Sequence, residues 1–342
     1  MLNESTQRAY RVGIVGAGGI AQIHADVLTN RLSEADLVAI CDISQETISR
    51  FGDKFNVPGR YLDLAEMLDN EELDIVIVCN WGIDHAQTTI QIAKSRKVKA
   101  ILCEKPLAMN TTEAEEMVAV AAETDVLLVE AFKFRHHPMH LKAKEMVDNG
   151  AIGDVFSIRS TLITGRGSAG SAARTPESNW RFNKAKGGGS INDIGCYCLA
   201  QARFIYGTEP MRLFAHSHIG IEVDDRAAVL LVFPENRIAQ FTVGFHSWPS
   251  QVVEINGTDG SLHMDKPWNN SDEATALTYQ SPEVTTVMDF TPRLQYTDQL
   301  HHLCECLSTG QPHRIPPQDS INQQKVLDAI TESMATGRVI DL

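Results

Sequence analysis

The sequence predicts two domains: an α/β domain with a doubly wound parallel sheet, and an α+β domain with a large, mostly antiparallel open sheet. The chain has 342 residues, and roughly 100–200 residues form one domain. Up to residue 132 strand and helix signals alternate, as in βαβ units. Beyond that point strand-like runs follow one another without helices between them, which is typical of antiparallel sheets. The expected domains are therefore 1–132 and 133–342, with the last helix a candidate to pack back on the first domain.

The expected strands of the first domain are continuous apolar runs, as in a parallel sheet that helices cover on both faces. The strands span 10–15, 35–42, 73–79, 98–104 and 125–132, and the helices span 19–30, 44–55, 63–70, 84–96 and 111–124. In the second domain we expect helices over 138–149, 192–206, 294–308 and 319–336. Its expected strands are 154–165, 211–219, 225–233, 237–246, 251–256, 260–264 and 275–280. Two of its apolar runs, 227–233 and 238–245, predict a sheet face that meets a second subunit in a homodimer or homotetramer.

Charge and cysteine usage narrow the possible partners. The 44 acidic and 30 basic residues give a net charge of −14, which disfavours nucleic acid and anionic membrane surfaces. The N-terminus has no apolar core of the signal-peptide type. Seven cysteines, an odd number with three at strand ends, suit reduced thiols in the cytoplasm. No metal site is predicted, because the cysteine pairs 196/198 and 304/306 are two residues apart and point to different helix faces.

A glycine-rich turn follows the first strand and opens the first helix. It reads G-x-G-x-x-A over Gly16, Gly18, Gly19, Ile20 and Ala21. In this pattern the first glycine allows a tight turn, the second lets a pyrophosphate approach the backbone, and the alanine permits close packing of helix and strand. The turn therefore predicts dinucleotide binding, with a strand–helix turn without ligand as the alternative.

Asp42 ends the second strand, where an acid binds the two hydroxyls of the adenosine ribose. A carboxylate there repels the additional phosphate of NADP, and the next residues, Ile43 and Ser44, include no arginine. NAD is therefore expected as the cofactor in preference to NADP. A solvated loop aspartate is the alternative.

Cys79 ends the expected strand 73–79 and Glu104 ends the expected strand 98–104, and Lys105 and Pro106 follow Glu104. Ligands bind outside the carboxyl ends of a doubly wound sheet, so we expect Cys79, Glu104 and Lys105 beside the nicotinamide half of the dinucleotide. Pro106 fixes φ and lacks an N–H group, which limits how far the lysine can swing. Locally, a lysine in a surface ion pair explains the pattern equally well.

These motifs together resemble the glucose–fructose oxidoreductase, inositol dehydrogenase and MocA-like (Gfo/Idh/MocA) family over nearly the whole chain. The resemblance rests on the glycine turn, the acid after the second strand, "EKP" at 104–106, "GGGSINDIGCYCL" at 187–199, "GTDGSL" at 257–262 and "VLDAITESMATGRVI" at 326–340. It implies an N-terminal Rossmann domain, a C-terminal α+β domain and a catalytic lysine, here Lys105. Where the family often has T-P-N, this chain has Asn80-Trp81-Gly82, which puts the usual cofactor contacts in doubt.

Asp193 and Tyr197 are four residues apart, so they share a face of the expected helix. In this family the position of Tyr197 is often histidine in the sugar–inositol branch and looks like tyrosine in the aldose and dihydrodiol branches. We expect Tyr197 and Lys105 to bind the substrate hydroxyl: one takes its proton while hydride leaves for the nicotinamide, and the other stabilises the alkoxide. Asp193 would orient a neighbouring hydroxyl. Core packing for Tyr197 and a helix-dipole role for Asp193 are the alternatives.

Further candidates come from weaker resemblances. Trp81 and His85 are expected along the cofactor, although His85 could simply begin a helix. Arg135, in the crossover "EAFKFRHHP" at 130–138, could bind substrate or join the domains. Within the polar stretch 165–186, Asn179 suits a hydroxyl-rich substrate, and Trp180-Arg181 resembles a pair beside the nicotinamide; Arg166 and Arg174 suit the same substrate. For His24 packing is expected.

The sequence is thus interpreted as an NAD-dependent dehydrogenase of a sugar or related polyol, or a reductase of the corresponding carbonyl. Tyr197 favours an aldose or cyclic sugar over inositol. Three alternatives remain. A trans-dihydrodiol dehydrogenase should need an apolar pocket. A non-catalytic dinucleotide sensor has no need of Lys105 and Tyr197. An S-adenosylmethionine methyltransferase has no use for the "EKP" lysine.

Overall fold

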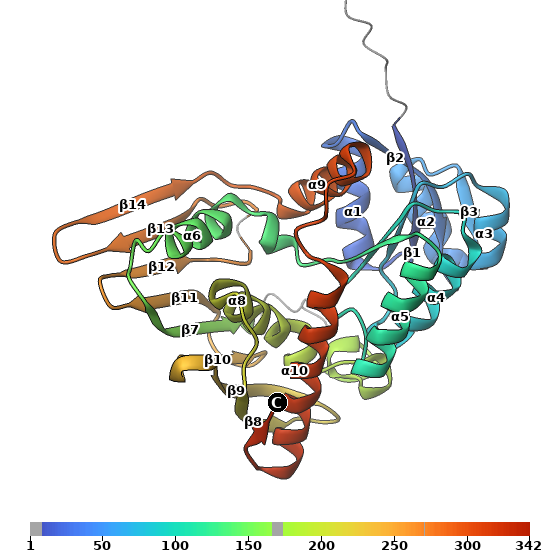
Figure 1. The fold of residues 1–342 in the computed structure, drawn as a ribbon. Coiled ribbons are helices and arrows are strands. Elements are labelled where there is room, and N and C mark those ends of the chain that lie inside the picture. Colours follow the sequence, from blue (N-terminus) through green and yellow to red (C-terminus); the bar gives the residue numbers. More distant parts are fainter. Residues whose placement is uncertain (1–8, 166–173, 270) are drawn as a thin grey trace, which may run out of the picture. The chain divides into compact units, whose positions relative to one another are not determined.

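The computed structural model describes residues 9–165, 174–269 and 271–342. They form two compact units, each built around one sheet (Figure 1). Unit 1 contains the chain up to Leu107, Thr112–Ala131 and Tyr296–Gln318. Unit 2 contains Ala108–Thr111, Phe132–Gln295 and Asp319–Leu342. The expected division after residue 132 differs from these units chiefly in that Tyr296–Gln318 groups with unit 1, whereas the last helix lies in unit 2 from Asp319 onward.

Unit 1 holds a six-stranded parallel sheet, which confirms the predicted doubly wound fold. Its strands are β1 (Tyr10–Val15), β2 (Ala35–Cys41), β3 (Gly59–Tyr61), β4 (Ile75–Val78), β5 (Ala100–Cys103) and β6 (Leu127–Glu130). They are arranged in the order β3-β2-β1-β4-β5-β6, and every pair is parallel. The strand order reverses at β1, where ligands of such sheets bind. The short strand β3 was not predicted.

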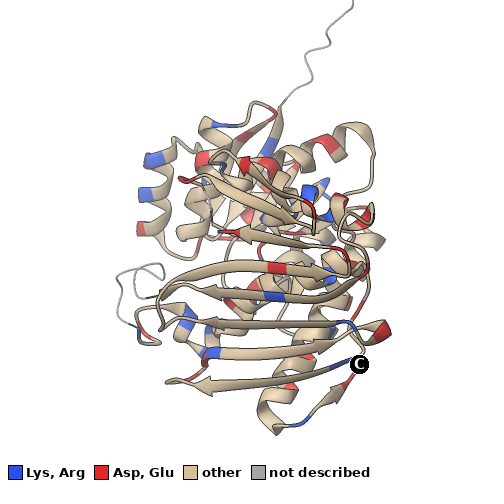
Figure 2. Ribbon diagram, turned by 90° about the vertical axis from the view of Figure 1, so that its left-hand side faces the viewer, with Lys and Arg blue, Asp and Glu red and all other residues tan. Residues whose placement is uncertain are grey.

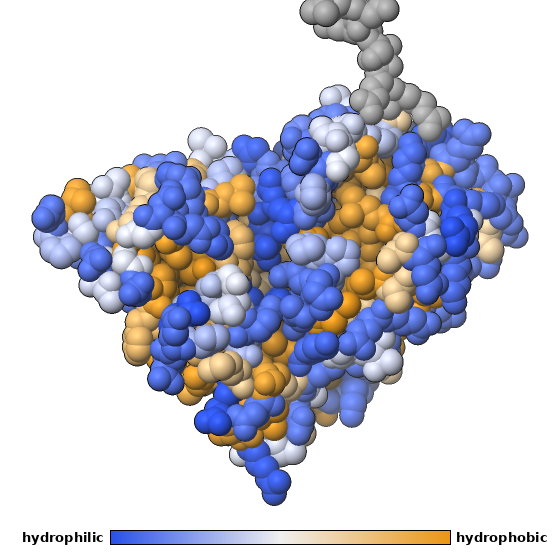
Figure 3. All heavy atoms as spheres, viewed as in Figure 1, coloured by the Kyte–Doolittle hydropathy of each residue, from blue (hydrophilic) through white to orange (hydrophobic). Residues whose placement is uncertain are grey.

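Helices cover the sheet of unit 1. They are α1 (Gly19–Asn30), α2 (Gln45–Phe55), α3 (Leu64–Asn70), α4 (His85–Ser95), α5 (Thr111–Glu123) and α9 (Gln295–Thr309). Ser44 caps α2: its side chain accepts a hydrogen bond from the N–H of Thr47 at 3.3 Å. Helix α9 lies beside α1 (Figure 1), where Tyr296 meets His24 edge to face at 5.2 Å between ring centroids. Hydrophilic residues cover the outward sides of α2 to α4 in Figure 3.

Unit 2 holds a nine-stranded sheet in the order β14-β13-β12-β11-β7-β10-β9-β8-β15. The strands are β7 (Val155–Ile163), β8 (Arg212–Ile219), β9 (Asp224–Val232), β10 (Ile238–Gly244), β11 (Ser250–Gly257), β12 (Ser261–Asp265), β13 (Thr275–Gln280), β14 (Thr285–Phe290) and β15 (Ile340–Asp341). All neighbours are antiparallel except β7 and β10. The predicted, mostly antiparallel sheet is confirmed, although β14 and β15 were missed.

The helices of unit 2 are α6 (Pro138–Asp148), α8 (Cys196–Tyr206) and α10 (Pro317–Thr336). Helix α8 packs on β7 and β10, which bury Ile158 and Phe241 on that face. On the opposite face Gln240, Arg159 and Glu254 lie opposite one another in neighbouring strands. The same row continues into Leu230 and Phe214 of β9 and β8, which are 40% and 39% exposed. Uncharged residues prevail over these strands in Figure 2. Among the described residues, none of the helices has the length and apolar character that crossing a membrane requires.

Candidate active site

The predicted cofactor segments of unit 1 meet at one edge of the parallel sheet. The backbone N–H groups of Gly16, Cys79 and Glu104 each donate to the last residue of a neighbouring strand, at 2.8, 2.7 and 3.0 Å. These bonds continue the strand ladder by one residue and hold the three loops at the same level. The glycine turn, the β4 loop and the "EKP" loop are therefore neighbours, as the sequence predicted.

Gly16 and Gly18 of the turn are glycines for different physical reasons. Gly16 has φ +89°, and a Cβ atom there would lie 2.6 Å from the backbone N of Asn80, so the fold itself requires glycine. Gly18 precedes α1 with φ −73° and ψ −167°. A Cβ atom on Gly18 or Gly19 would meet no heavy atom within 4 Å. The turn therefore leaves room for a group to approach the N-terminus of α1, whose N–H groups favour anions. Ile20 follows, half-buried.

Asp42 connects this turn to the end of β2. Its Oδ2 atom accepts a hydrogen bond from the N–H of Ala17 at 2.8 Å, and its Oδ1 atom accepts one from Ser44 at 2.9 Å. Each carboxylate oxygen has a second lone pair for a ribose hydroxyl. The neighbouring Ile43 has 87% of its surface exposed. This exposed apolar residue beside the acid was not among the predicted cofactor residues.

A buried pair supports the "EKP" loop. Nε2 of His24 lies 2.9 Å from Oε1 of Glu104, and His24 is fully buried and Glu104 nearly so. Burial alone raises the pKa of Glu104, but the hydrogen bond from His24 and the positive charge of Lys105 help to outweigh burial, and the pKa is lowered. Glu104 is therefore a carboxylate, and its Oε2 accepts a hydrogen bond from the backbone N–H of the half-buried Lys105 at 3.3 Å. The role of His24 as Glu104's partner was not predicted.

Two further side chains hold the loop after Lys105. Nδ1 of His85 lies 2.9 Å from the carbonyl of Pro106, and its Nε2 lies 3.2 Å from the carbonyl of Asn80. Burial lowers the pKa of His85, and a neutral ring has one N–H, which we assign to the shorter contact. Oε1 of Glu130 accepts a hydrogen bond from Leu107 N–H at 2.9 Å. Glu130 was missed by sequence reasoning, although an acid that ends an apolar strand was visible.

The β4 loop carries the remaining predicted cofactor residues of unit 1. Cys79 is buried, and burial raises the pKa of its thiol well above the ordinary value, so the thiol is neutral. Asn80 donates from Nδ2 to the hydroxyl of Thr88 at 2.8 Å. Trp81 is 41% exposed and starts the short turn before α4. The exposed indole is accordingly the residue of this loop that is best placed to meet a ligand.

Asp193 and Tyr197 lie in unit 2. A π-helical turn, Ile191–Gly195, precedes α8, so the spacing between Asp193 and Tyr197 is not that of a regular α-helix. Tyr197 is 8% exposed, and its ring packs against Phe132 and Phe134 at centroid distances of 5.9 and 6.1 Å. π turns occur frequently at functional sites.

Three predicted residues, Asn179, Trp180 and Arg181, form one turn that contacts Asp193 through Arg181. Oδ2 of Asp193 accepts a hydrogen bond from Nε of Arg181 at 2.7 Å in an ion pair that buries the carboxylate. The guanidinium of Arg181 lies over the ring of Trp180 at 4.9 Å. Oδ1 of Asn179 accepts from the N–H of Arg181 at 3.2 Å. A Cβ atom on Gly188 would lie 2.6 Å from the carbonyl oxygens of Trp180 and Arg181, so close backbone packing explains this glycine.

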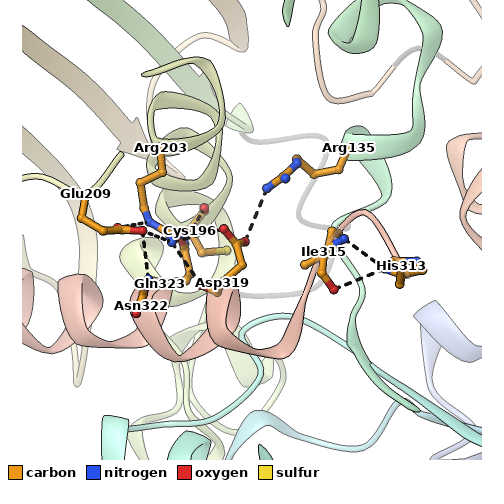
Figure 4. A network of polar contacts seen from close by, with 9 residues as sticks. All are labelled: Arg135, Cys196, Arg203, Glu209, His313, Ile315, Asp319, Asn322 and Gln323. Carbon is orange, nitrogen blue, oxygen red and sulfur yellow. Dashed lines mark hydrogen bonds and ion pairs between the residues drawn. The ribbon is translucent and has the colours of Figure 1, made fainter. Parts of the chain in front are cut away.

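Arg135 belongs to a different polar network in unit 2 (Figure 4). It is buried, its Nη1 lies 3.4 Å from Oδ2 of Asp319, and its guanidinium lies over the ring of Phe204 at 4.2 Å. In the same network Arg203 donates two hydrogen bonds to Glu209, at 2.6 and 2.7 Å. It donates two more to Asp319, to the carbonyl at 3.1 Å and to Oδ1 at 3.3 Å. These contacts favour a packing role for Arg135.

Arg174 and Arg166 are the other two arginines that were expected to suit the substrate. The guanidinium of Arg174 donates to the carbonyl of Gly165 at 2.7 Å and to the carbonyl of Phe245, and it lies 2.8 Å from Nδ1 of His246. These are contacts with the protein's own backbone and side chains. Arg166 lies outside the described residues.

Comparison with known proteins identifies the family. Residues 10–132 match the oxidoreductase family with an NAD-binding Rossmann fold (GFO_IDH_MocA), and residues 140–263 match the GFO/IDH/MocA C-terminal domain. The chain belongs to the Gfo/Idh/MocA oxidoreductase family. The resemblance that the sequence motifs indicated is thereby confirmed.

Several Gfo/Idh/MocA proteins are similar over most of the chain. D-xylose 1-dehydrogenase (NADP(+)) 2 of Haloferax volcanii is 28% identical over 335 residues, which are 96% of this chain and 99% of the relative. Trans-1,2-dihydrobenzene-1,2-diol dehydrogenase of Mus musculus is 28% identical over 308 residues, or 88% and 89% of the two chains. The aldose-aldose oxidoreductase structure from Caulobacter crescentus, complexed with glycerol, aligns with a TM-score of 0.87 at 25% identity, covering 98% and 100%.

The described geometry fits the dinucleotide of a Gfo/Idh/MocA oxidoreductase. The open side of Gly18 and Gly19 leaves space at the N-terminus of α1 for a pyrophosphate, and Asp42 presents carboxylate oxygens beside the same turn. These features meet the two requirements of an NAD(P)-binding Rossmann domain, phosphate approach and ribose recognition. This protein is accordingly an NAD(P)-binding oxidoreductase.

Proposed function

We propose that this protein is an NAD-dependent dehydrogenase of an aldose or a related cyclic sugar, acting on a hydroxyl or on the corresponding carbonyl. The observation that carries the proposal is the "EKP" loop: Lys105 follows a buried carboxylate at the sheet edge, next to the glycine turn. The names of the relatives, a D-xylose dehydrogenase and an aldose-aldose oxidoreductase, support this substrate class.

In the proposed mechanism, Lys105 and Tyr197 hold the hydroxyl that reacts. The nicotinamide ring, when bound, supplies the hydride acceptor. One of the two residues takes the hydroxyl proton, and the other donates a hydrogen bond to the developing alkoxide. A nearby ammonium favours the phenolate form of a tyrosine, so the two residues together can move a proton near neutral pH. Glu104 fixes the charge beside the lysine.

Asp193 and its neighbours provide substrate orientation in this proposal. Oδ2 of Asp193 pairs with Arg181, and a carboxylate has about four lone-pair sites, so Asp193 can also accept a hydrogen bond from a substrate hydroxyl. Asn179 and Trp180 shape the same turn. Because the Arg181–Asp193 pair is polar, it favours a substrate with several hydroxyl groups.

We further propose NAD as the preferred cofactor, because the Asp42 carboxylate would repel the ribose phosphate of NADP. The exposed side chain of Ile43 offers an apolar surface for the adenine. Titration by nicotinamide fluorescence should give a Kd for NADH at least tenfold below that for NADPH, and Asp42→Ala should reduce this ratio. Tighter binding of NADPH by the unmodified chain, as the name of the Haloferax relative would suggest, would exclude the preference.

A panel of aldoses, inositol and a trans-dihydrodiol tests the substrate, with turnover read from the absorbance of the reduced nicotinamide. On the best substrate, Lys105→Met and Tyr197→Phe should each lower kcat by about 10²–10⁴-fold while the Kd for NADH stays unchanged. Lys99→Met, which removes a lysine paired with Asp74 in unit 1, and Tyr279→Phe in unit 2 are matched controls. Unchanged turnover in both catalytic variants would contradict the mechanism.

A trans-dihydrodiol is the second candidate substrate. The aromatic surroundings of Tyr197, formed by Phe132 and Phe134, favour it, and the mouse relative carries that name. The ion pair of Arg181 with Asp193 favours the sugar. In the panel, a dihydrodiol turned over with a higher kcat/KM than every aldose would decide for this candidate.

We also propose that the face of the nine-stranded sheet opposite α8 joins two copies of the chain. Arg159 pairs with Glu254 of its own chain on this face, and the row that they share continues through Gln240 to the exposed side chains of Leu230 and Phe214. An opposed copy can cover these two apolar side chains, which come partly from the apolar run 227–233. Sedimentation velocity should show a dimer or tetramer. A monomer at all concentrations would rule the proposal out.

A further inference from the structure

His24 is a fully buried histidine that no step of the proposed mechanism uses. It lies on α1, its ring meets the edge of Tyr296 on α9 at 5.2 Å, and its Nε2 lies 2.9 Å from Oε1 of Glu104. Its other ring nitrogen, Nδ1, is buried and has no hydrogen-bond partner among the described residues. A ring whose one polar neighbour is a carboxylate carries its proton on Nε2 and donates it to that carboxylate.

Glu104 needs such a donor. An ionised carboxylate out of contact with water is costly unless hydrogen bonds and opposite charges compensate for the lost hydration. The titratable groups that face it are His24 from α1, His85 from α4, Cys79 at the end of β4, Cys103 at the end of β5, and the adjacent Lys105. Burial raises the pKa of the Cys103 thiol well above its ordinary value, so this thiol is neutral. Cys79 is a neutral thiol and burial keeps His85 neutral, so His24 supplies the donated hydrogen bond and Lys105 the opposite charge.

We propose that His24 is a positioning residue that keeps Glu104 ionised and oriented beside Lys105, and so sets how firmly the lysine amine holds its proton. The inference rests on the proposed role of Lys105 in proton transfer. A fixed negative charge in a poorly hydrated site favours the ammonium form of a neighbouring lysine. Without the hydrogen bond from His24, Glu104 would take up a proton and Lys105 would release its own more readily.

Site-resolved acylation of Lys105 tests this without any substrate or cofactor. The full-length chain is treated with an amine-acylating reagent over a range of pH, and the rate at Lys105 is read by peptide mass spectrometry. Both His24→Leu and Glu104→Gln should lower the pH midpoint of acylation by about one unit, since loss of an opposite charge shifts a pKa by roughly 1–3 units. At a pH below both midpoints the rate should rise about tenfold.

Two variants serve as controls. His24→Gln places an amide N–H near the original Nε2 position and should restore the midpoint of the unmodified chain. His301→Gln removes a second histidine–glutamate pair of unit 1, that of His301 with Glu34, and should change nothing at Lys105. Thermal melting reports which variants are folded. Glu104→Gln keeps the shape of the side chain and decides the question if His24→Leu does not fold.

An unchanged midpoint in folded Glu104→Gln would overturn the proposal, as would a midpoint in folded His24→Leu equal to that of the unmodified chain. The proposed function fails by a different result, unchanged turnover in Lys105→Met. Once a substrate is found, the pH profile of kcat should shift in His24→Leu in the same direction as the acylation midpoint, and His24→Gln should reverse the shift.

Discussion

The glycine turn allows two similar substitutions to be separated into one that disturbs the fold and one that disturbs cofactor binding. Gly16→Ala adds a methyl group 2.6 Å from the backbone N of Asn80 and 2.7 Å from the carbonyl carbon of Cys79. Gly18→Ala adds the same group where no heavy atom lies within 4 Å. The chemical change is identical and the residues are two apart, so each variant is the control for the other.

The expected energies differ in sign. At Gly16 the φ of +89° costs an alanine about 1–2 kcal/mol, and the overlap with β4-loop backbone adds about 1–3 kcal/mol. The free energy of unfolding should therefore fall by about 2–5 kcal/mol. At Gly18 the φ of −73° suits alanine, so the free energy of unfolding should stay unchanged or rise by about 0.4–1 kcal/mol. The new methyl group of Gly18→Ala nevertheless occupies the space through which a pyrophosphate approaches α1.

Urea unfolding and titration with NADH measure the two effects. Gly18→Ala should keep its unfolding midpoint and weaken NADH binding at least tenfold, whereas Gly16→Ala should unfold at lower urea. If Gly18→Ala bound NADH as tightly as the unmodified chain, the turn would not be the pyrophosphate site. If Gly16→Ala kept its stability, the close contact with the β4 loop would not constrain this position.

Two further predictions concern unit 2. Arg203→Leu should lower the free energy of unfolding by about 3 kcal/mol, because it removes the buried partner of Glu209 and Asp319. The control Arg212→Leu, from an exposed ion pair, should lower it by less than about 1 kcal/mol. Equal losses of the two variants in urea unfolding would contradict the importance of burial. His140 is buried with a pKa of about 4, lowered from 6.5 chiefly by burial, so the unfolded chain takes up its proton first and stability is lost as the pH falls. Between pH 7 and pH 5 this loss is about 2 kcal/mol, and the decrease measured by urea unfolding should be smaller in His140→Gln.

Most helices and strands of unit 1 could be predicted from the sequence because the strands are buried on both faces. Such strands appear as continuous apolar runs that end where the loops of the site begin, so the pattern alone was enough to place Gly16, Asp42 and Lys105 at strand ends. The strand β3 has three residues and follows Pro58, too few for a pattern to show. Strand β14 is mostly exposed, so burial imposes no alternation on its residues.

What the sequence could not show are partners far apart along the chain. His24 and Glu104 are 80 positions apart, and their hydrogen bond follows from packing α1 beside the end of β5. The ion pair of Arg181 with Asp193 joins a polar turn to a helix start. The sequence suggested separate roles for them, Arg181 beside the nicotinamide and Asp193 on a substrate hydroxyl. Helical spacing also assumed a regular α-helix before Tyr197, and local hydrogen bonding produced a π turn there.

The return of Tyr296–Gln318 to unit 1 means that the nucleotide-binding half of this protein is not a contiguous gene segment. A fragment that stops near residue 132 would lack α9 and leave His24 without the aromatic ring that covers it. Recombination or truncation at the apparent boundary would thus separate a helix from the sheet that it protects. A gene for this half alone would need to join the coding segment of Tyr296–Gln318 to that of the N-terminal part.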